Sequence, residues 1–386
     1  MKLIQLCCRA IALAAVFGAM SSDASAAMQA PADRNDTVQA TLDRGAPLGD
    51  VAIFEHASGG YDSSDAKRWG TNSWTCQSST DAATGACPTT PVWTASGDST
   101  TIKLSFKEEK TGATTVLDLR GASANTLHVA CDGNDIPEMT TPLRDPVQEA
   151  MIPAVASCPE RLWDGRALFV AIPAEELKKL PSGGTWKANL RLNLRKWAAS
   201  NQATIAVFRA EITLNVTDKN NIQVYLPEFT SATPTVDLKL RKLANGSRML
   251  GESTVDMCLY DGYNSQSMWF DVSASDRLTI DRRDSGQYSV LLDSDKSGAY
   301  DSRIDYNVSL FYEGKNIVLP NNETVRLQGV NNSQGRLVSL PGISVPVVCT
   351  PTPLTLYTPE FQSVWKRPGK YSNRLTITFT PSSASL

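Results

Sequence analysis

The stretch TWKANLRLNL, residues 185–194, alternates apolar and polar side chains without a break. An extended strand would place Trp186, Ala188, Leu190, Leu192 and Leu194 on one face. The segment 208–216 alternates in the same way, which makes it the natural return strand. The pattern predicts an antiparallel pair of strands with one face buried.

The same alternation recurs along most of the chain. It predicts strands near residues 101–106, 117–119, 221–229, 236–240, 255–260, 288–292, 306–312, 343–348 and 374–379. A helical pattern is confined to residues 173–180, where Leu177 and Leu180 share a face before Pro181. Many short strands separated by Gly, Pro, Asn and Ser predict an all-β protein built from antiparallel sandwiches.

A signal peptide and a domain boundary divide the chain of 386 residues. Residues 1–27 combine a basic start, a short apolar run and small residues at the end, which predicts a secretory signal peptide. The polar stretch around 218–220 lies between two alternating segments. We therefore expect a first domain over 28–217, a short linker over 218–220 and a second domain over 221–386. A linker this short cannot act as a long tether, so the domains should lie end to end.

The composition argues against several classes of function. A net charge of −3 does not favour a nucleic-acid binder. His56 and His128 are the two histidines in the sequence, and no catalytic or cofactor motif occurs, so we expect neither an enzyme nor a cofactor. Residues 293–298 resemble the start of a calcium loop, but the twelfth position is Ile304 rather than Glu, so no metal site is expected.

The cysteines predict disulfides. Cys7 and Cys8 lie in the signal peptide, so six of the eight cysteines remain after its removal. An even number in a secreted chain indicates disulfides, although six cysteines allow 15 pairings. Sequential pairing is favoured because four cysteines fall in the first domain and two in the second. The expected pairs are Cys76–Cys87, Cys131–Cys158 and Cys258–Cys349.

The end of the chain indicates an incomplete domain. Tyr371 precedes the alternating segment 374–379, as a corner tyrosine precedes the penultimate strand of an immunoglobulin-like sandwich. The residues after Phe379 include Pro381 and three serines and cannot form another full apolar strand. A missing last strand leaves an edge that invites a strand from another chain. The alternatives are a different, complete topology, or residues 28–50 folding back into the gap.

Several uncommon strings resemble one family, the minor tip subunits of alternate-chaperone (class 5) fimbriae, which include the tip adhesins of colonisation-factor pili and the initiator of cable pili. The strings are IPA (172–174), ELKKLP (176–181), LNVTDK (214–219), DMCLYDGY (256–263), ISVPV (343–347) and ITFTPSS (377–383).

The resemblance implies two immunoglobulin-like domains with separate tasks. The first would bind a host-cell receptor, and the second would be a pilin domain that lacks its final strand. A periplasmic chaperone would fill the gap first, and the N-terminal strand of the major pilin would replace it at the outer-membrane usher. Residues 28–50 contain no clear alternating apolar run to donate in turn, so the protein should lie at the fimbrial tip on the cell surface.

The resemblance also places a receptor-binding cluster at Arg68, Arg195 and Lys196. One arginine of the family pattern falls on Trp197, and the loop around Arg68 differs in length. Arginine binds carboxylates through paired hydrogen bonds, and tryptophan can stack on a sugar. An acidic glycan, such as a sialylated one, would suit these residues, whereas an ordinary solvated strand face is the alternative.

The donor-strand groove should be lined from two strands. We expect Ile222, Val224 and Leu226 on the first strand of the second domain, and Leu375, Ile377 and Phe379 on its last. A slip of one residue would reverse both faces. Two other functions remain open: an assembly initiator without receptor binding, and a monomeric secreted carbohydrate-binding protein.

Overall fold

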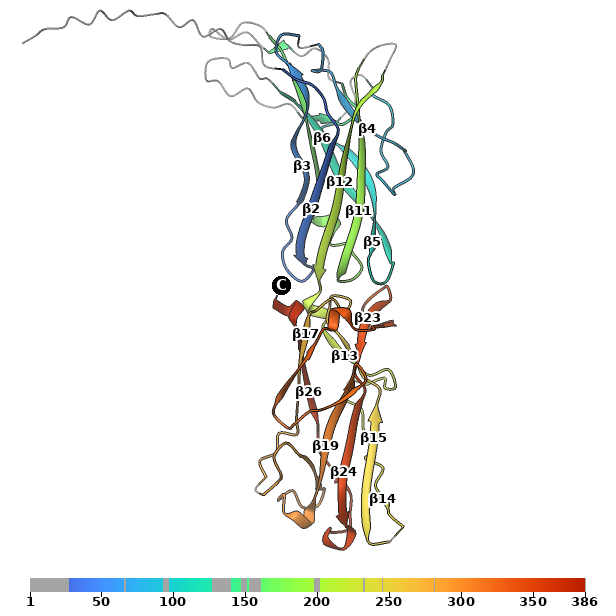
Figure 1. Cartoon of the computed structure of the whole chain (residues 1–386), viewed down its shortest axis with the longest axis vertical. Helices are drawn as coiled ribbons and strands as arrows, with labels where there is room; N and C mark the ends of the chain where they lie inside the picture. The colour runs from blue at the N-terminus through green and yellow to red at the C-terminus, as the bar shows by residue number, and fades with distance from the viewer. Residues whose placement is uncertain are drawn as a thin grey trace, which may run out of the picture.

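The computed structural model describes residues 28–385 apart from 66, 93–96, 127–139, 147–150, 153–160, 198–201, 232, 245 and 281. It is a rod of two β-rich bodies joined end to end (Figure 1). The all-β prediction is confirmed, since α1 (Ala174–Leu177) is the single α-helix in the part of the chain described. The immunoglobulin-like topology stays a prediction.

The first body is built on a 10-stranded sheet. Its main path runs β1-β3-β10-β6-β5-β11-β12-β2, with β4 beside β11 and β7 beside β6. The strands are β1 (Met28–Gln29), β2 (Arg34–Asp43), β3 (Val51–Asp62), β4 (Ser73–Cys76), β5 (Thr100–Glu108), β6 (Thr114–Thr126), β7 (Thr140–Pro142), β10 (Gly165–Ile172), β11 (Gly184–Arg195) and β12 (Thr204–Thr217). A separate two-stranded sheet joins β8 (Met151–Ile152) to β9 (Arg161–Leu162).

The strand pair expected from the 185–194 pattern is the centre of this body. β11 and β12 pair antiparallel, with Trp186 opposite Leu214 and Leu192 opposite Phe208. All four of these side chains are buried in one core that also receives residues from the other strands. The polar positions of β11 face outward, as the alternation predicted.

The N-terminal segment is used within the first body. β2 runs parallel to β12, from the pair Arg34–Phe208 to the pair Asp43–Thr217. Val38, Ala40 and Leu42 are half-buried against the first core. The alternative in which residues 28–50 fold back into the second domain is therefore wrong, because β1 and β2 pair with β3 and β12 instead.

The second body contains three sheets. Their orders are β13-β16-β23-β22, then β14-β15-β24-β19-β18-β25 with β20 beside β19, and finally β21-β17-β26. The strands are β13 (Gln223–Tyr225), β14 (Arg241–Lys242), β15 (Arg248–Val255), β16 (Cys258–Tyr260), β17 (Trp269–Ser275), β18 (Tyr288–Leu292), β19 (Arg303–Tyr312), β20 (Lys315–Val318), β21 (Thr324–Gln328), β22 (Arg336–Val338), β23 (Val347–Pro351), β24 (Leu354–Gln362), β25 (Tyr371–Ser372) and β26 (Thr376–Pro381). Short 3₁₀ turns are η1 (Lys219–Asn221), η2 (Tyr300–Ser302), η3 (Val330–Asn332), η4 (Ser363–Trp365) and η5 (Ser382–Ser385).

Four expected strands differ in this body. The strand expected over 343–348 begins only at Val347, and the strand expected over 255–260 is divided between the end of β15 and β16. Residues 236–240 form no regular strand, and the strand expected over 221–229 is reduced to β13. Five apolar side chains of these segments still pack on the second core while remaining half-buried: Val224, Leu226, Phe229, Val236 and Leu238. An extended segment needs a partner for its backbone groups before it becomes a regular strand, and alternation alone does not supply one.

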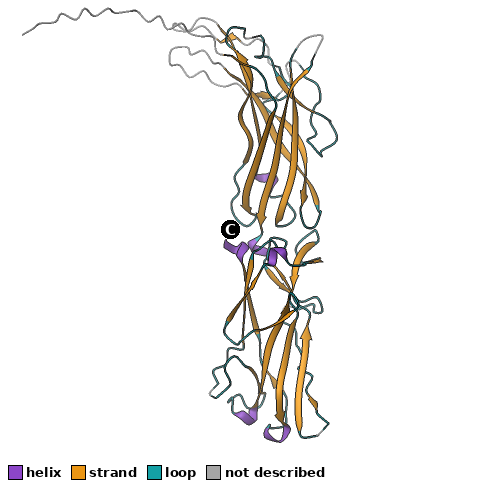
Figure 2. Cartoon of the chain, viewed as in Figure 1, coloured by secondary structure: helices purple, strands orange, loops and turns teal. Residues whose placement is uncertain are grey.

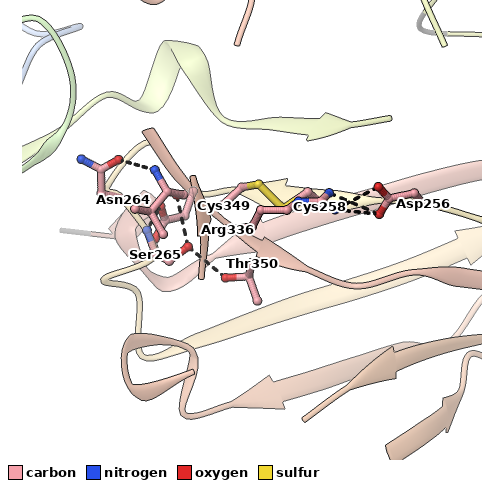
Figure 3. Close-up of a disulfide and its surroundings, with 9 residues drawn as sticks. Asp256, Cys258, Asn264, Ser265, Arg336, Cys349 and Thr350 are labelled. Atoms are coloured by element: carbon pink, nitrogen blue, oxygen red, sulfur yellow. Dashed lines mark hydrogen bonds and ion pairs between the residues drawn. A yellow bond between two sulfur atoms is a disulfide. The ribbon is translucent and has the colours of Figure 1, made fainter. Parts of the chain in front are cut away.

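Two disulfides are present among the described residues. Cys76 is joined to Cys87 in the first body, and Cys258 is joined to Cys349 in the second, as sequential pairing predicted. Cys131 and Cys158 lie outside the described residues. The second disulfide links β16 to β23 beside the residues that reach the first body (Figure 3).

The two bodies meet through backbone and polar contacts. The Asn264 side-chain amide donates to the Gly183 carbonyl at 2.8 Å, while its oxygen accepts from the Val348 N–H at 2.9 Å. Lys110 reaches across from the first body and donates to the carbonyls of Ser265 and Asn331 at 2.7 and 3.1 Å. These contacts couple the β16–β23 region of the second body to the hairpin ends of the first.

Candidate functional site

Arg68 is held at one end of the first body by a buried carboxylate. Its side chain is 47% exposed, whereas that of Asp62, at the end of β3, is 1% exposed, and the two are joined by an ion pair of 2.9 Å. Asp62 also accepts from the Ser64 hydroxyl at 2.6 Å, which is the main cause of the lowered pKa of Asp62. The guanidinium carbon of Arg68 lies 5.4 Å from the centre of the Trp69 ring. One edge of the guanidinium is thus fixed by Asp62, and the side chain stays about half exposed between Trp69 and the Met28 sulfur.

Arg195 ends β11 and is anchored separately. Its guanidinium donates to the Thr204 hydroxyl at 2.7 Å and to the Thr89 carbonyl at 3.4 Å. Its Nε is buried and has no hydrogen-bond partner. Ser73 of β4 stands opposite it in the strand register. Arg195 is therefore positioned by three segments that are far apart in sequence.

Lys196 and Trp197 follow directly. Lys196 is exposed, Trp197 is half-buried, and the Lys196 backbone N–H donates to the Ala203 carbonyl at 3.0 Å. This hydrogen bond extends the pairing of β11 with β12 by one residue beyond Arg195. This keeps both side chains at the end of the strand pair.

The four predicted receptor residues lie at one pole of the first body. The strand register brings the end of β3, the start of β10 and the end of β6 together at one end of the sheet, which is where Asp62, Gly165 and Thr126 lie. Arg195 reaches that end as well, because Trp186 at the other end of β11 pairs with Glu108 next to the second body. No contact joins Arg68 to Arg195 among the hydrogen bonds and ion pairs of the described residues, so they share a pole but have separate anchors.

A buried arginine at this pole was not predicted from the sequence. Arg166 of β10 has no exposed surface and donates to Asn125 at 2.5 Å, to Thr141 at 3.0 Å and to the Asp145 carbonyl at 3.1 Å. Burial lowers the pKa of Arg166 to about 10, so it stays charged at neutral pH. It fastens β7 and residue 145 to β6 and β10. An arginine within an apolar strand pattern gave no signal for this role.

The second candidate site is the free edge of β26. This strand pairs with β17 on one side, and the order β21-β17-β26 leaves its other side at the edge of the sheet in the described structure. Leu375, Ile377 and Phe379 are half-buried against the second core. The Phe379 ring lies 4.7 Å from that of Phe270, edge to face. The strand therefore presents an unpaired backbone beside a partly exposed apolar row.

A second apolar row packs on the same core. Val224 and Leu226 were expected there, and Phe229, Val236 and Leu238 join them although their alternation did not predict a place in the groove. Ile222 is half-buried nearer the junction, beside Gly262. All of these residues except Ile222 share the core that supports β26.

The described residues contain neither a candidate metal-binding cluster nor a helix suited to span a membrane. No cluster of three or more His, Cys, Asp or Glu residues there could hold a metal ion. No helix in the same part is both long enough and apolar enough to cross a membrane.

Comparison with known proteins places both bodies in one family. Residues 23–219 match the family model for the first domain of CfaE, a CFA/I fimbrial protein, and residues 222–383 match the model for its second domain. The chain is 32% identical over 322 residues to CfaE of Escherichia coli, covering 81% of each chain.

Solved structures agree with this match. The crystal structure of CfaE, the adhesive subunit of CFA/I fimbria of enterotoxigenic E. coli, gives a TM-score of 0.74 at 29% identity, over 92% of this chain and 94% of that one. The structure of a point mutant of that adhesin gives 0.69 at 29% identity, over 93% and 95%. A chaperone–tip adhesin complex involved in CFA/I biogenesis gives 0.67 at 28% identity, over 92% and 98%.

Proposed function

Since the chain belongs to the CfaE family of CFA/I fimbrial proteins, whose members are adhesive subunits at the tips of fimbriae, we propose that its two domains divide adhesion from assembly. The protein is exported to the cell surface and starts the fimbria. Its domain near residues 28–217 carries the receptor site, and the domain near 221–386 accepts the strand of the next subunit.

The open edge of β26 carries the assembly proposal. An edge strand leaves backbone N–H and C=O groups unpaired, and a strand from another chain can pair with them and cover the half-exposed apolar side chains beside it. We infer an acceptor groove lined by Val224 and Leu226 on one wall and by Leu375, Ile377 and Phe379 on the other, with Ile222 at its upper end. A periplasmic chaperone occupies it first, and the N-terminal strand of the major pilin then replaces the chaperone at the usher.

The internal use of β2 supports the tip position. This strand is already paired along its length with β12 of the same chain. A subunit whose N-terminal strand is used internally can accept a strand but does not have that strand to pass on. It therefore belongs at the end of the fibre where no further subunit is added.

The receptor proposal rests on the pole that carries Arg68, Arg195, Lys196 and Trp197. The guanidinium groups of Arg68 and Arg195 are each held by a contact within the protein, to Asp62 and to Thr204. Both side chains remain partly exposed, and a guanidinium group suits a carboxylate ligand. An acidic glycan with a sugar face near Trp197 fits this chemistry. The receptor site would act by binding alone, and this proposal requires no catalytic step.

The acceptor groove is tested by supplying the strand. The chain expressed alone should aggregate or be degraded, and a peptide matching the major pilin's N-terminal strand, fused after Leu386 through a short turn, should rescue a stable monomer. A fused peptide of the same composition in scrambled order is the control. Equal stability of the unfused and fused chains would show that no strand is missing.

The receptor site is tested on assembled fimbriae. Arg68→Ala combined with Arg195→Ala should abolish adhesion to host cells or to sialylated glycans while fimbriae still form. Arg120→Ala is the matched control, because Arg120 is an exposed arginine of the same domain with a loose ion pair of 3.7 Å to Asp98. Wild-type adhesion by the double variant would leave an assembly initiator that does not bind through these residues.

A further inference from the structure

An exposed aromatic and aliphatic patch lies at the end of the second domain farthest from the first. η2 and η4 are the two short helices at the lower pole in Figure 2. They expose Tyr300 by 50%, Val364 by 80% and Trp365 by 56%. The rings of Tyr300 and Trp365 are 6.4 Å apart, and Val364 precedes Trp365 in η4. We call these three exposed residues the basal patch. Large apolar groups gathered at one exposed point usually mark an interaction site.

The basal patch is held in place by polar contacts beneath it. The Lys366 ammonium lies 3.5 Å from the centre of the Tyr300 ring and donates to the Tyr300 carbonyl. The Arg367 backbone N–H donates to the Asp301 carbonyl at 2.9 Å, and the Ser363 N–H donates to the Ser247 carbonyl at 2.9 Å. The patch is therefore part of a fixed surface rather than a loose loop tip, which lowers the entropic cost of binding to it.

The path of an added strand leads to this pole. At the upper end of β26 the chain turns into η5, where the buried Ser383 donates to the carbonyl of Asp261 at 2.8 Å and to the hydroxyl of Ser267 at 3.2 Å. The first domain stands directly beyond (Figure 1). A strand lying along β26 can therefore connect to its own folded body only past the lower end, where the basal patch lies.

We propose that the basal patch is the docking surface for the folded body of the pilin subunit whose strand fills the groove; this rests on the acceptor groove proposed above. Strand insertion then places a second subunit against Tyr300, Val364 and Trp365. The contact continues the groove and fixes the angle between the two subunits. Tryptophan and tyrosine are the residues most often found to dominate such contacts.

The charge around the patch defines the matching surface. Lys366 and Arg367 border it, and Arg241 and Lys242 of the neighbouring β14 are exposed. Asp295 pairs with Arg367, and the exposed Asp301 of η2 lies beside Tyr300, so the cationic side of the border is the one formed by Arg241 and Lys242. The partner should offer an apolar surface with carboxylates on the side that faces β14.

The test separates the patch from the groove. The Val364→Ser, Trp365→Ala double variant, prepared as the full chain in complex with its chaperone, is mixed with a synthetic peptide of the pilin's N-terminal strand or with the whole pilin. The peptide should replace the chaperone at the wild-type rate, whereas the whole pilin should do so about tenfold more slowly, the scale of a lost interface tryptophan. Val318→Ser, at a side chain exposed by 60% on β20, is the control and should change neither rate.

Three outcomes would overturn the proposal. Unchanged rates for both ligands would show that nothing docks on the patch. Equal slowing for peptide and pilin would show that the variant disturbs the groove itself. A loss of chaperone complex from the periplasm would identify the chaperone as the occupant. If wild-type protein fails to take up the peptide at all, the acceptor groove is refuted independently of the patch.

Discussion

A Cβ atom on Gly183 would lie 1.9 Å from the carbonyl oxygen of Gly262, so the two domains meet at a point where no side chain fits between their backbones. A separation of this size cannot be relieved by a side-chain rotation, because the obstructing atom belongs to the main chain. The end-to-end arrangement thus depends on a glycine at this position.

Gly183→Ala should loosen the junction without unfolding either domain. The backbones must separate, and the contact between Asn264 and the Gly183 carbonyl is lost with them. We expect proteolysis within 218–220 to become about tenfold faster, which corresponds to roughly 1.4 kcal/mol of lost protection. Gly49→Ala is the control, since a Cβ there meets nothing within 4 Å. Equal cleavage rates in the two variants would mean that the close approach does not hold the domains together.

Asp62→Asn should release Arg68 in a pH-dependent manner. Hydrogen bonds from Ser64 lower the pKa of Asp62 below the ordinary 3.8. A lowered folded-state pKa gives stability that is present above the unfolded pKa and is lost as the pH falls through the folded one. The difference in Tm between wild type and variant should therefore persist from about pH 7 to pH 5 and disappear near pH 2.

The measurement is calorimetry of the full chain complemented by a donor peptide, because the uncomplemented chain is not expected to be stable. Asp36→Asn is a suitable comparison, since Asp36 bonds to the exposed Arg34. A Tm difference for Asp62→Asn that does not change with pH would contradict the proposed anchor.

Arg166→Met should destabilise the first domain by about 2–4 kcal/mol. The methionine has a similar length but leaves the oxygens of Asn125, Thr141 and Asp145 without their donor inside the protein. Denaturant unfolding followed by fluorescence would measure the loss. Arg120→Met, which removes an exposed and loosely paired arginine, should cost less than about 0.5 kcal/mol. Similar losses in both variants would refute the structural role of Arg166.

Phe379→Ala should weaken the acceptor groove. The ring packs edge to face on Phe270, and its removal takes away part of the apolar surface that a donated strand would cover. We expect the donor peptide to bind about 1–3 kcal/mol less favourably, a smaller effect than for a fully buried phenylalanine. Thr378→Ala is the matched control on the same strand, because Thr378 is exposed. A larger effect at Thr378 than at Phe379 would show that the donated strand lies on the other face.

The sequence predicted those features that depend on local alternation. The pattern at 185–194 corresponds to β11, and the short helical pattern at 173–180 to α1. Neighbourhood along the chain was also enough to choose two of the disulfide pairs. Each of these inferences uses a period or an order that a single segment carries by itself.

Other features depended on partners far away in the sequence. β2 forms because its backbone pairs in parallel with β12, although its apolar residues cover only one face in part. The strand expected at 236–240 does not form, because alternation within a segment does not guarantee a neighbour for its backbone. The contacts of Arg166 join β10 to β6, to β7 and to residue 145, whose proximity no local pattern encodes.

The Cys258–Cys349 disulfide also has a consequence for the timing of export. Its two cysteines are 91 residues apart, and a chain that crosses the membrane N-terminus first, as the expected signal peptide would direct, delivers Cys349 late. The loop cannot close until almost the whole second domain has arrived in the oxidising compartment. The segment that contains β26 follows soon after. Oxidation of this pair and exposure of the open edge are thus nearly simultaneous, so the need for protection begins only after most of the second domain has been exported.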